Sequence, residues 1–219
     1  MDVVSEPGLR ADALRNRRRI LDAAAEAFAE RGLEVGVAEI ARRAGVGAGT
    51  IFRRFPSKED LIAAVVEQRI EEMAALGEQA LGADDPGAAF REFVLDGVER
   101  QIRDRGFFDA AKSQMGADPR LREVRDRFIE VSGRLLKRAQ DAGTVRRDLA
   151  AQDVPVLMCA AAGTPPPLLD MYPDVWRRYA AVVLDGMAPA GASELGPEAP
   201  DLAALDEALA RAATAARPA

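Results

Sequence analysis

The sequence predicts an all-α protein, and three observations support this prediction. Apolar residues recur at three- and four-residue spacing in one segment after another, whereas no segment alternates apolar and polar residues as a half-buried strand does. Alanine is abundant and aromatic residues make up only 5 % of the chain, a composition that favours helices over strands. Glycine and proline fall between the periodic segments, where helices end.

The first sixty residues predict three helices, over residues 12–31, 37–44 and 48–54. Gly32 stops the first helix. The second and third have the spacing of a helix-turn-helix unit, because Gly45 lies where the turn needs a positive φ that glycine adopts at little cost. Val46 and Ile51 then follow at positions that fill the core beneath the third helix.

Ser57 and Asp60 have the spacing of a capping box that opens a fourth helix, which continues until Gly82. Further apolar faces predict helices over residues 90–102, from Gly106, and over residues 118–142, 154–163 and 176–187. Beyond Pro189 the composition shifts to Ala, Gly, Pro and Glu, which predicts a mobile tail with a short helix over residues 201–211. The expected domains are residues 1–60, with an ordered core from about residue 12, residues 61–188, and the tail, residues 189–219.

The chain has no histidine and one cysteine, which excludes several classes of enzyme and metal site. Ser-His-Asp and Cys-His nucleophile systems need an imidazole to accept the proton, and zinc sites need His or several Cys. The N-terminus lacks the apolar core of a secretory signal, and no stretch approaches the ~20 apolar residues of a membrane span. We therefore expect a cytoplasmic protein without catalytic residues, metal or cofactor.

The net charge of −6 is distributed unevenly along the chain. From Arg10 to Lys58, eleven Lys and Arg stand against six Asp and Glu, a net charge of +5 that leaves −11 for all other residues. A basic segment on an acidic body favours phosphate binding at the basic end, because the local field at the contact surface decides. A merely solvated charged face is the alternative.

Three glycines at alternate positions, in the stretch GVGAGT that starts at Gly45, pose a choice between a phosphate-binding loop and a helix-turn-helix. A P-loop needs a Lys after its last Gly, and a dinucleotide fingerprint needs a third Gly where this chain has Thr50. Both phosphate loops fail on spacing. The helix-turn-helix motif fits the residue type at every position that can be checked. On this spacing alone, two ordinary short helices of a bundle stay possible.

A longer match supports the helix-turn-helix. The segments RILDAAAEAFAERG and VAEIARRAGVGAGTIFRRFPSKEDLIAAV resemble the N-terminal domain of the TetR family of bacterial transcription regulators, from about Arg17 to Val66. The rest of the chain resembles the family only in its helical plan. The residues at the family's spacing are Ala24, Phe28, Gly32, Ile40, Ala41, Ala44, Gly45, Val46, Gly49, Thr50, Phe55, Lys58 and Glu59.

The resemblance implies a homodimer whose N-terminal domain binds a double-stranded DNA operator. It also implies a C-terminal domain that binds a small-molecule effector of unknown identity and dimerises through its last helices. Three residues depart from the family pattern: Gly47 replaces Ser, Phe52 replaces Tyr, and Arg54 replaces His. Because Phe52 cannot donate a hydrogen bond to phosphate and Arg54 can, we expect this role to have moved to Arg54.

On this basis the predicted DNA-binding residues are Arg17, Arg18, Gly47, Ala48, Thr50, Phe52, Arg53, Arg54 and Lys58. Lys58 starts the fourth helix, where its charge and the free backbone N–H groups can meet a phosphate. Arg53 is the candidate for a base edge and Arg54 for a phosphate. At most two of the three arginines from Arg17 to Arg19 can face DNA.

The candidate effector-binding residues are Phe93, Phe107, Phe108, Met115, Met158 and Cys159. Their spacing is equally that of ordinary core residues, so this alternative stays open. Cys159 is expected to be an inert buried thiol, because the sequence places no basic residue beside it. The predicted function is that of a ligand-responsive regulator that represses transcription at a palindromic operator. The alternative is a helical protein that sequesters a small molecule and keeps a vestigial DNA-binding head.

Overall fold

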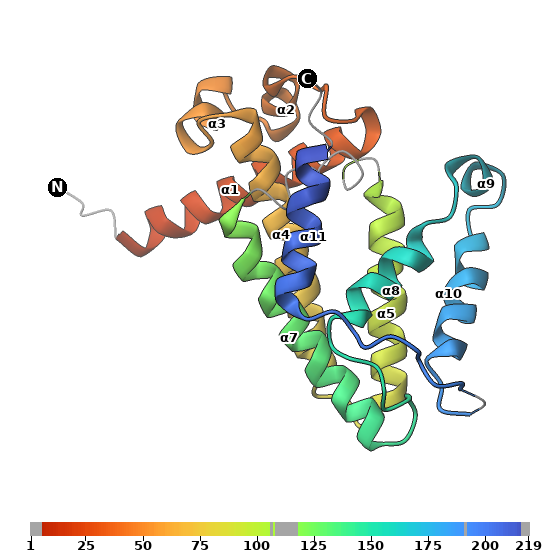
Figure 1. Ribbon diagram of the computed structural model, residues 1–219. Coiled ribbons are helices and arrows are strands. Elements are labelled where there is room, and N and C mark those ends of the chain that lie inside the picture. The colour runs from red at the N-terminus through yellow and green to blue at the C-terminus, as the bar shows by residue number, and fades with distance from the viewer. Residues whose placement is uncertain (1–5, 106, 108–117, 191, 216–219) are drawn as a thin grey trace.

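The computed structural model describes residues 6–105, 107, 118–190 and 192–215, and within them every regular element is a helix, as predicted. Three helices form a head at one end of the molecule, and further helices form the body below it (Figure 1). Helix α4 belongs to both parts, because it starts beside the head and runs down the body. The head is the part that the sequence predicted in most detail.

The head contains α1 (Glu6–Arg31), α2 (Val37–Ala44) and α3 (Ala48–Arg54). Helix α1 begins six residues before the expected start and projects beyond the rest of the head (Figure 1). Its buried side is apolar at helical spacing, with Ile20, Leu21 and Phe28 fully buried. From α2, Ile40 and Ala44 join the same core.

The turn between α2 and α3 depends on Gly45, which has the predicted positive φ of 64°. In this conformation the Gly45 N–H donates to the Arg42 carbonyl oxygen at 3.2 Å, and the Val46 N–H donates to that of Ala41 at 3.0 Å. These bonds satisfy carbonyl groups at the end of α2 that the helix leaves without partners. The turn therefore fixes the angle at which α3 leaves α2.

We expect Gly45→Ala to lower the free energy of unfolding by about 1 kcal/mol, because a side chain disfavours the left-handed conformation. Urea denaturation followed by circular dichroism measures the change. Gly49→Ala is the control: Gly49 lies within α3 at negative φ, and a Cβ there meets no atom within 4 Å. This control should be neutral or slightly stabilising. Equal losses of unfolding free energy in Gly45→Ala and Gly49→Ala would contradict the role assigned to the positive φ of Gly45.

Helix α4 (Lys58–Ala80) starts with the predicted capping box. The Asp60 N–H donates to Ser57 Oγ at 3.0 Å, and the Ser57 N–H donates to Asp60 Oδ2 at 3.2 Å. The Ser57 hydroxyl also donates to Asp60 Oδ2, and this hydrogen bond lowers the pKa of Asp60 more than any other contact does. The start of α4, and with it Lys58, is therefore held in one geometry.

The body consists of α4 packed with α5 (Pro86–Arg103), α7 (Pro119–Asp141), α8 (Asp153–Ala162) and α10 (Val175–Gly186). Asp85 and Asp118 cap α5 and α7 through their side chains. The head core does not stop at residue 60: it continues along α4 to Val66 and includes Leu121 and Val124 of α7. A second core cluster lies between α5, α7, α8 and α10.

Side chains of α7 and α5 pack directly against the backbone of α4 at Gly77. A Cβ added to Gly77 would lie 2.5 Å from Val131 Cγ1 of α7, which is closer than real Cβ contacts come, and 3.1 Å from Phe93 Cε2 of α5. A larger residue at this position would therefore displace Val131. The crossing of α4 and α7 at this point depends on glycine.

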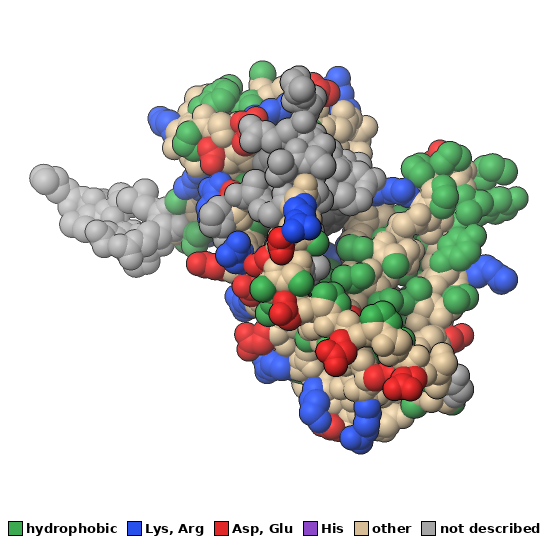
Figure 2. Space-filling model, in the orientation of Figure 1, with side chains coloured by type: hydrophobic (Ala, Val, Ile, Leu, Met, Phe, Trp, Pro, Cys, Tyr) green, Lys and Arg blue, Asp and Glu red, His purple; other side chains and the backbone are tan. Residues whose placement is uncertain are grey.

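The C-terminal half contains features that the sequence did not predict. A short helix, α9 (Pro166–Met171), lies where we predicted no helix, because Pro166 and Pro167 suit the first turn of a new helix. On α10, Trp176 is buried whereas Tyr179 is 41 % exposed. Apolar side chains gather on the surface of α9 and α10 (Figure 2).

The sequence beyond residue 189 contains α11 (Leu202–Ala215), slightly longer than the expected helix. The Asp201 carboxylate caps it by accepting from the Ala204 N–H at 2.8 Å. The mobility expected of this tail stays a prediction. The short helix expected from Gly106 lies outside the described residues, except for Phe107, which is helical and buried.

Candidate nucleic-acid interface

Helix α3 has one buried and one exposed face. Ile51 points into the head core and is almost fully buried, whereas Phe52 is 50 % exposed and Arg53 is exposed beside it. The exposed face continues through Gly47 and Gly49 at the start of the helix. A short helix that is anchored by one apolar residue and otherwise open to solvent is suited to entering the major groove of DNA.

Arg53 has the geometry expected of a residue that reads bases. Its Nη2 donates a hydrogen bond to Thr50 Oγ1 at 3.3 Å, one turn earlier on α3. That bond directs the guanidinium along the exposed side of the helix, beside the half-buried Thr50. A planar guanidinium held in this way can donate two hydrogen bonds to the edge of a guanine.

Arg54 has a contact that the sequence did not predict. Its Nη1 donates to the Ala13 carbonyl oxygen at 2.6 Å and so ties the end of α3 to α1. Arg19 makes a second bridge, since its Nη2 donates to the Ala44 carbonyl oxygen at 2.8 Å. Both arginines therefore position the recognition helix, and their remaining N–H groups can still meet phosphate.

A groove of about 530 Å³ separates α1 from the end of α3. Four of its side chains carry charge and three of these are arginines, so the groove is basic overall. Sequence reasoning did not assign Arg15 and Asn16 to the site, because the pairing of α1 with α3 is a tertiary contact without a local signal. The lining residues are Asp12, Ala13, Arg15, Asn16, Arg19 and Arg54.

The other predicted basic residues divide into two groups. Arg17 Nη2 lies 3.3 Å from Glu67 Oε2 of α4, so Arg17 turns toward the body, whereas Arg18 is exposed. Lys58 is half-buried at the first position of α4. Arg18 and Lys58 thus remain the stronger phosphate-binding candidates beside Arg54.

Not every arginine of the head is available to DNA. Arg42 and Arg43 both donate to Glu39, at 2.7 Å from Arg42 Nη2 and 3.0 Å from Arg43 Nε. These hydrogen bonds lower the pKa of Glu39 to about 2, so its carboxylate stays ionised and keeps both arginines on α2. Arg43 is also paired with Glu30 of α1 at 2.8 Å. This cluster joins α1 to α2 and neutralises part of the basic charge.

Of the six predicted effector-binding residues, Phe93, Phe107 and Met158 lie in the packed core. Phe107 is fully buried and stacks on Phe28, with ring centroids 5.8 Å apart, and Phe93 packs against Phe128 at 6.0 Å. Met158 is fully buried. Cys159 is exposed, so the expectation of a buried thiol was wrong. Phe108 and Met115 lie outside the described residues.

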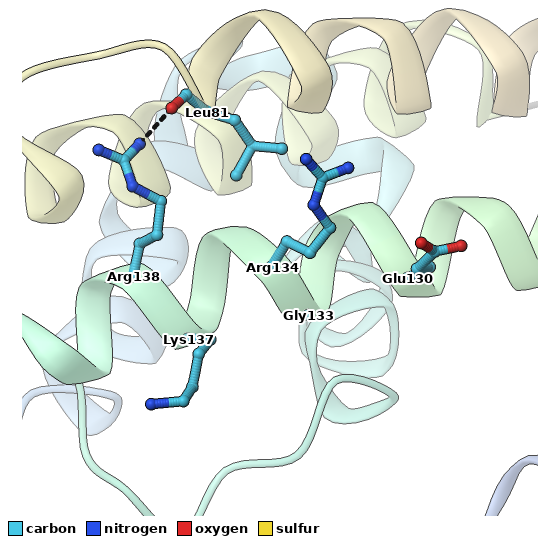
Figure 3. A pocket seen from close by; sticks show the side chains of 6 residues that line it. All are labelled: Leu81, Glu130, Gly133, Arg134, Lys137 and Arg138. Atoms are coloured by element: carbon cyan, nitrogen blue, oxygen red, sulfur yellow. Dashed lines mark hydrogen bonds between the residues drawn. The ribbon is translucent and has the colours of Figure 1, made fainter.

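A groove of about 500 Å³ in the body follows the outer side of α7 (Figure 3). Arg138 donates from Nη1 to the Leu81 carbonyl oxygen at 2.5 Å, and Arg134 Nη1 donates to Glu78 at 2.9 Å. Lys137 pairs with Asp141. Since its basic side chains already have partners on α4 and α7, this groove does not extend the DNA-facing surface.

Comparison with known proteins agrees with this geometry. The model of the tetR family of bacterial regulatory proteins matches residues 20–65, and that of the SbtR-like transcriptional regulator C-terminal domain matches residues 85–189. An HTH-type transcriptional regulator of Mycobacterium bovis is 32 % identical over 150 residues, which are 67 % of this chain and 78 % of the relative.

Two solved structures are similar. The TetR transcription regulatory protein of Mycobacterium vanbaalenii has a TM-score of 0.64 and 37 % identity, and the match covers 82 % of this chain and 99 % of that one. FadR of Bacillus subtilis, solved in complex with stearoyl-CoA, has a TM-score of 0.60 over 80 % of this chain and 99 % of its own. At 18 % identity it supports the fold alone.

None of the helices in the described part of the chain is long and apolar enough to cross a membrane. The two family models together span the head and most of the body, and the helix-turn-helix geometry agrees with them. The chain belongs to the TetR family and is a transcription regulator with an N-terminal helix-turn-helix DNA-binding domain.

Proposed function

We propose that the protein represses transcription by binding a palindromic operator as a homodimer, and that a small-molecule effector changes this binding. The observation that carries the proposal is the exposed face of α3, where Arg53 reaches solvent while Ile51 holds the helix in the core. On this proposal residues 1–60 bind DNA and residues 61–188 bind the effector and dimerise. The protein acts in the cytoplasm and catalyses no reaction.

The exposed apolar face of α8 to α10 supports dimerisation through the body. It is defined by Val156, Met171, Tyr172, Tyr179 and Val182, all at least 41 % exposed. Large apolar side chains that gather on one face of a protein mark an interaction site. A two-fold axis in this face would bury it against its own copy, and an axis that runs from the body toward the head would place the two heads on the same side of the dimer.

For the effector we infer a site within the body, near Phe93, Phe107 and Met158. FadR of Bacillus subtilis shares this fold and was solved with stearoyl-CoA bound, which supports a ligand site in such a body. In this chain the three side chains are fully packed. A ligand there would have to separate α5 from α7 or α8, and this movement would reach the head through α4 and α7.

The experiment that tests DNA binding is selection of genomic fragments by the purified protein, followed by sequencing. We expect the retained fragments to share a two-fold symmetric sequence, because two recognition helices related by symmetry read two half-sites. Retention of fragments without any common sequence would contradict the proposal. It would support instead a vestigial head on a protein that sequesters a small molecule.

We expect Arg53→Ala and Lys58→Ala to affect DNA binding differently. Loss of Arg53 should cost about 1–3 kcal/mol per base contact on the operator and less on random DNA, because a base contact carries sequence preference. Loss of Lys58 should weaken binding to both DNAs equally, and flatten the plot of log affinity against log salt by roughly one unit per lost phosphate contact.

Fluorescence anisotropy at several salt concentrations measures both effects, with Arg91→Ala as control because Arg91 is exposed on α5 in the body. Arg54→Ala should combine a lost phosphate contact with a displaced α3, since it also breaks the bond to Ala13. If Arg53→Ala lowers both affinities in parallel, Arg53 is not the base-reading residue.

A further inference from the structure

The C-terminal helix α11 follows the segments that the family models match, which end at residue 189. It lies beside α7 (Figure 1), and ion pairs join the two helices. The Asp206 carboxylate accepts from Arg122 Nε at 3.2 Å and from Arg125 Nη2. The residues are about 80 positions apart in the sequence, so this contact is purely tertiary.

The chain that leads to α11 is attached at two further points. Gln152 Nε2 donates to the Pro200 carbonyl oxygen at 2.9 Å, and Arg146 Nη2 donates to that of Ser193. Arg146 is itself held by Asp148, since its Nε donates to Asp148 Oδ1 at 2.6 Å. Polar bonds therefore attach the tail to the body at several points along its length.

The pair between Arg125 and Asp206 is shielded from solvent. The Arg125 side chain is 11 % exposed and that of Asp206 is 23 % exposed. An ion pair in such surroundings is screened less than a surface pair, and removing one partner leaves an uncompensated charge. Asp206 is therefore the strongest attachment of the tail to α7 among those described.

A neighbouring face of the same segment of α7 contacts the head. Leu121 and Val124 belong to the head core, and Arg120 Nη2 lies 3.2 Å from Asp60 Oδ1. Asp60 is the capping-box residue that holds the start of α4. The first turns of α7 thus contact both the tail helix and the head.

We propose that α11 is a strap that holds the first turns of α7 against the head and thereby raises the affinity of the head for DNA. Asp206 restrains Arg122 and Arg125, and Arg120 on the same turns restrains Asp60 beside Lys58. With the strap in place the head is held in one orientation. When it is released the head has more orientations, and binding DNA must remove this additional freedom. The inference rests on the DNA binding proposed above.

The test compares Asp206→Asn with Glu207→Gln in the full-length chain, on the DNA fragments selected by the parent protein. We expect Asp206→Asn to lower the affinity about three- to tenfold without changing its salt dependence, because no phosphate contact is lost. Removal of one negative charge would by itself strengthen DNA binding slightly, and Glu207→Gln controls for this effect because it removes the same charge. Glu207 is exposed and pairs with Arg211 within α11, so Glu207→Gln should bind at least as tightly as the parent, and Asp206→Glu should restore binding.

A chain that ends at Pro189 should show the same fall, because it lacks the strap while Arg122 and Arg125 become hydrated. An unchanged or higher affinity for DNA in both Asp206→Asn and the shortened chain would overturn the proposed role of α11. If the parent protein selects no DNA, the proposed function fails. Amide hydrogen exchange then still tests whether α11 holds the first turns of α7 against the head. Exchange at residues 57–61 should be faster in Asp206→Asn than in Glu207→Gln, and equal rates would overturn it.

Discussion

Val182→Asp is expected to convert the dimer to monomers at micromolar concentration. Val182 is 66 % exposed on α10 and lies on the apolar face shared with Val156 and Tyr179. In a two-fold interface the substitution would place two carboxylates near each other in a buried apolar environment, where each loses its hydration. Light scattering measures the change in mass.

The same variant should lose most of its affinity for the operator, because two linked heads bind a palindrome far more tightly than one head binds a half-site. Leu202→Asp is the matched control, since Leu202 is also an exposed aliphatic residue but lies at the start of α11, outside this face. A Val182→Asp protein that stays dimeric would place the dimer interface elsewhere on the body.

Phe28→Ala is expected to lower the free energy of unfolding by about 3–5 kcal/mol, the usual cost of removing a buried aromatic ring. Phe28 is fully buried and stacks on Phe107, so the substitution leaves a cavity at the junction between head and body. Urea denaturation measures the loss. Because native domains are stable by only ~5–15 kcal/mol, this single change removes a large fraction of the total.

Phe52→Ala deletes the same ring from the exposed face of α3 and serves as the control. Its effect on unfolding should stay within about 0.5 kcal/mol, as is usual for surface substitutions. Similar losses at Phe28 and Phe52 would mean that the head core is not organised around α1.

The head was predictable because its signals are local. The positive φ at Gly45, the box between Ser57 and Asp60 and the spacing of Ile40 and Ile51 act within a few residues, and the structure has each of them in place. The family resemblance then supplied the function, which no periodicity contains. The roles assigned to Arg53 and Lys58 in DNA binding stay predictions.

Elsewhere the sequence pattern was ambiguous, or the contact joined residues far apart in the chain and left no local pattern. Helix α8 is apolar on nearly every side, so spacing could not place Cys159 on its exposed face. Composition could not indicate that Asp206, beyond Pro189, meets Arg122 and Arg125. The bond from Arg54 to Ala13 joins residues 41 positions apart, and no local pattern predicts such a contact.

Because α4 crosses α7 at Gly77, within the body, a rotation of α4 about this crossing would displace the start of the helix far more than the residues near Gly77. At 1.5 Å per residue, Lys58 stands about 28 Å along α4 from that point. A tilt of about 2° around the crossing therefore carries the start of α4 sideways by about 1 Å. In a homodimer, equal and opposite tilts of α4 in the two subunits would change the separation of the two heads by twice that amount. A tilt of about 2° is thus large enough to move Lys58, a predicted phosphate-binding residue, out of hydrogen-bonding distance of its phosphate.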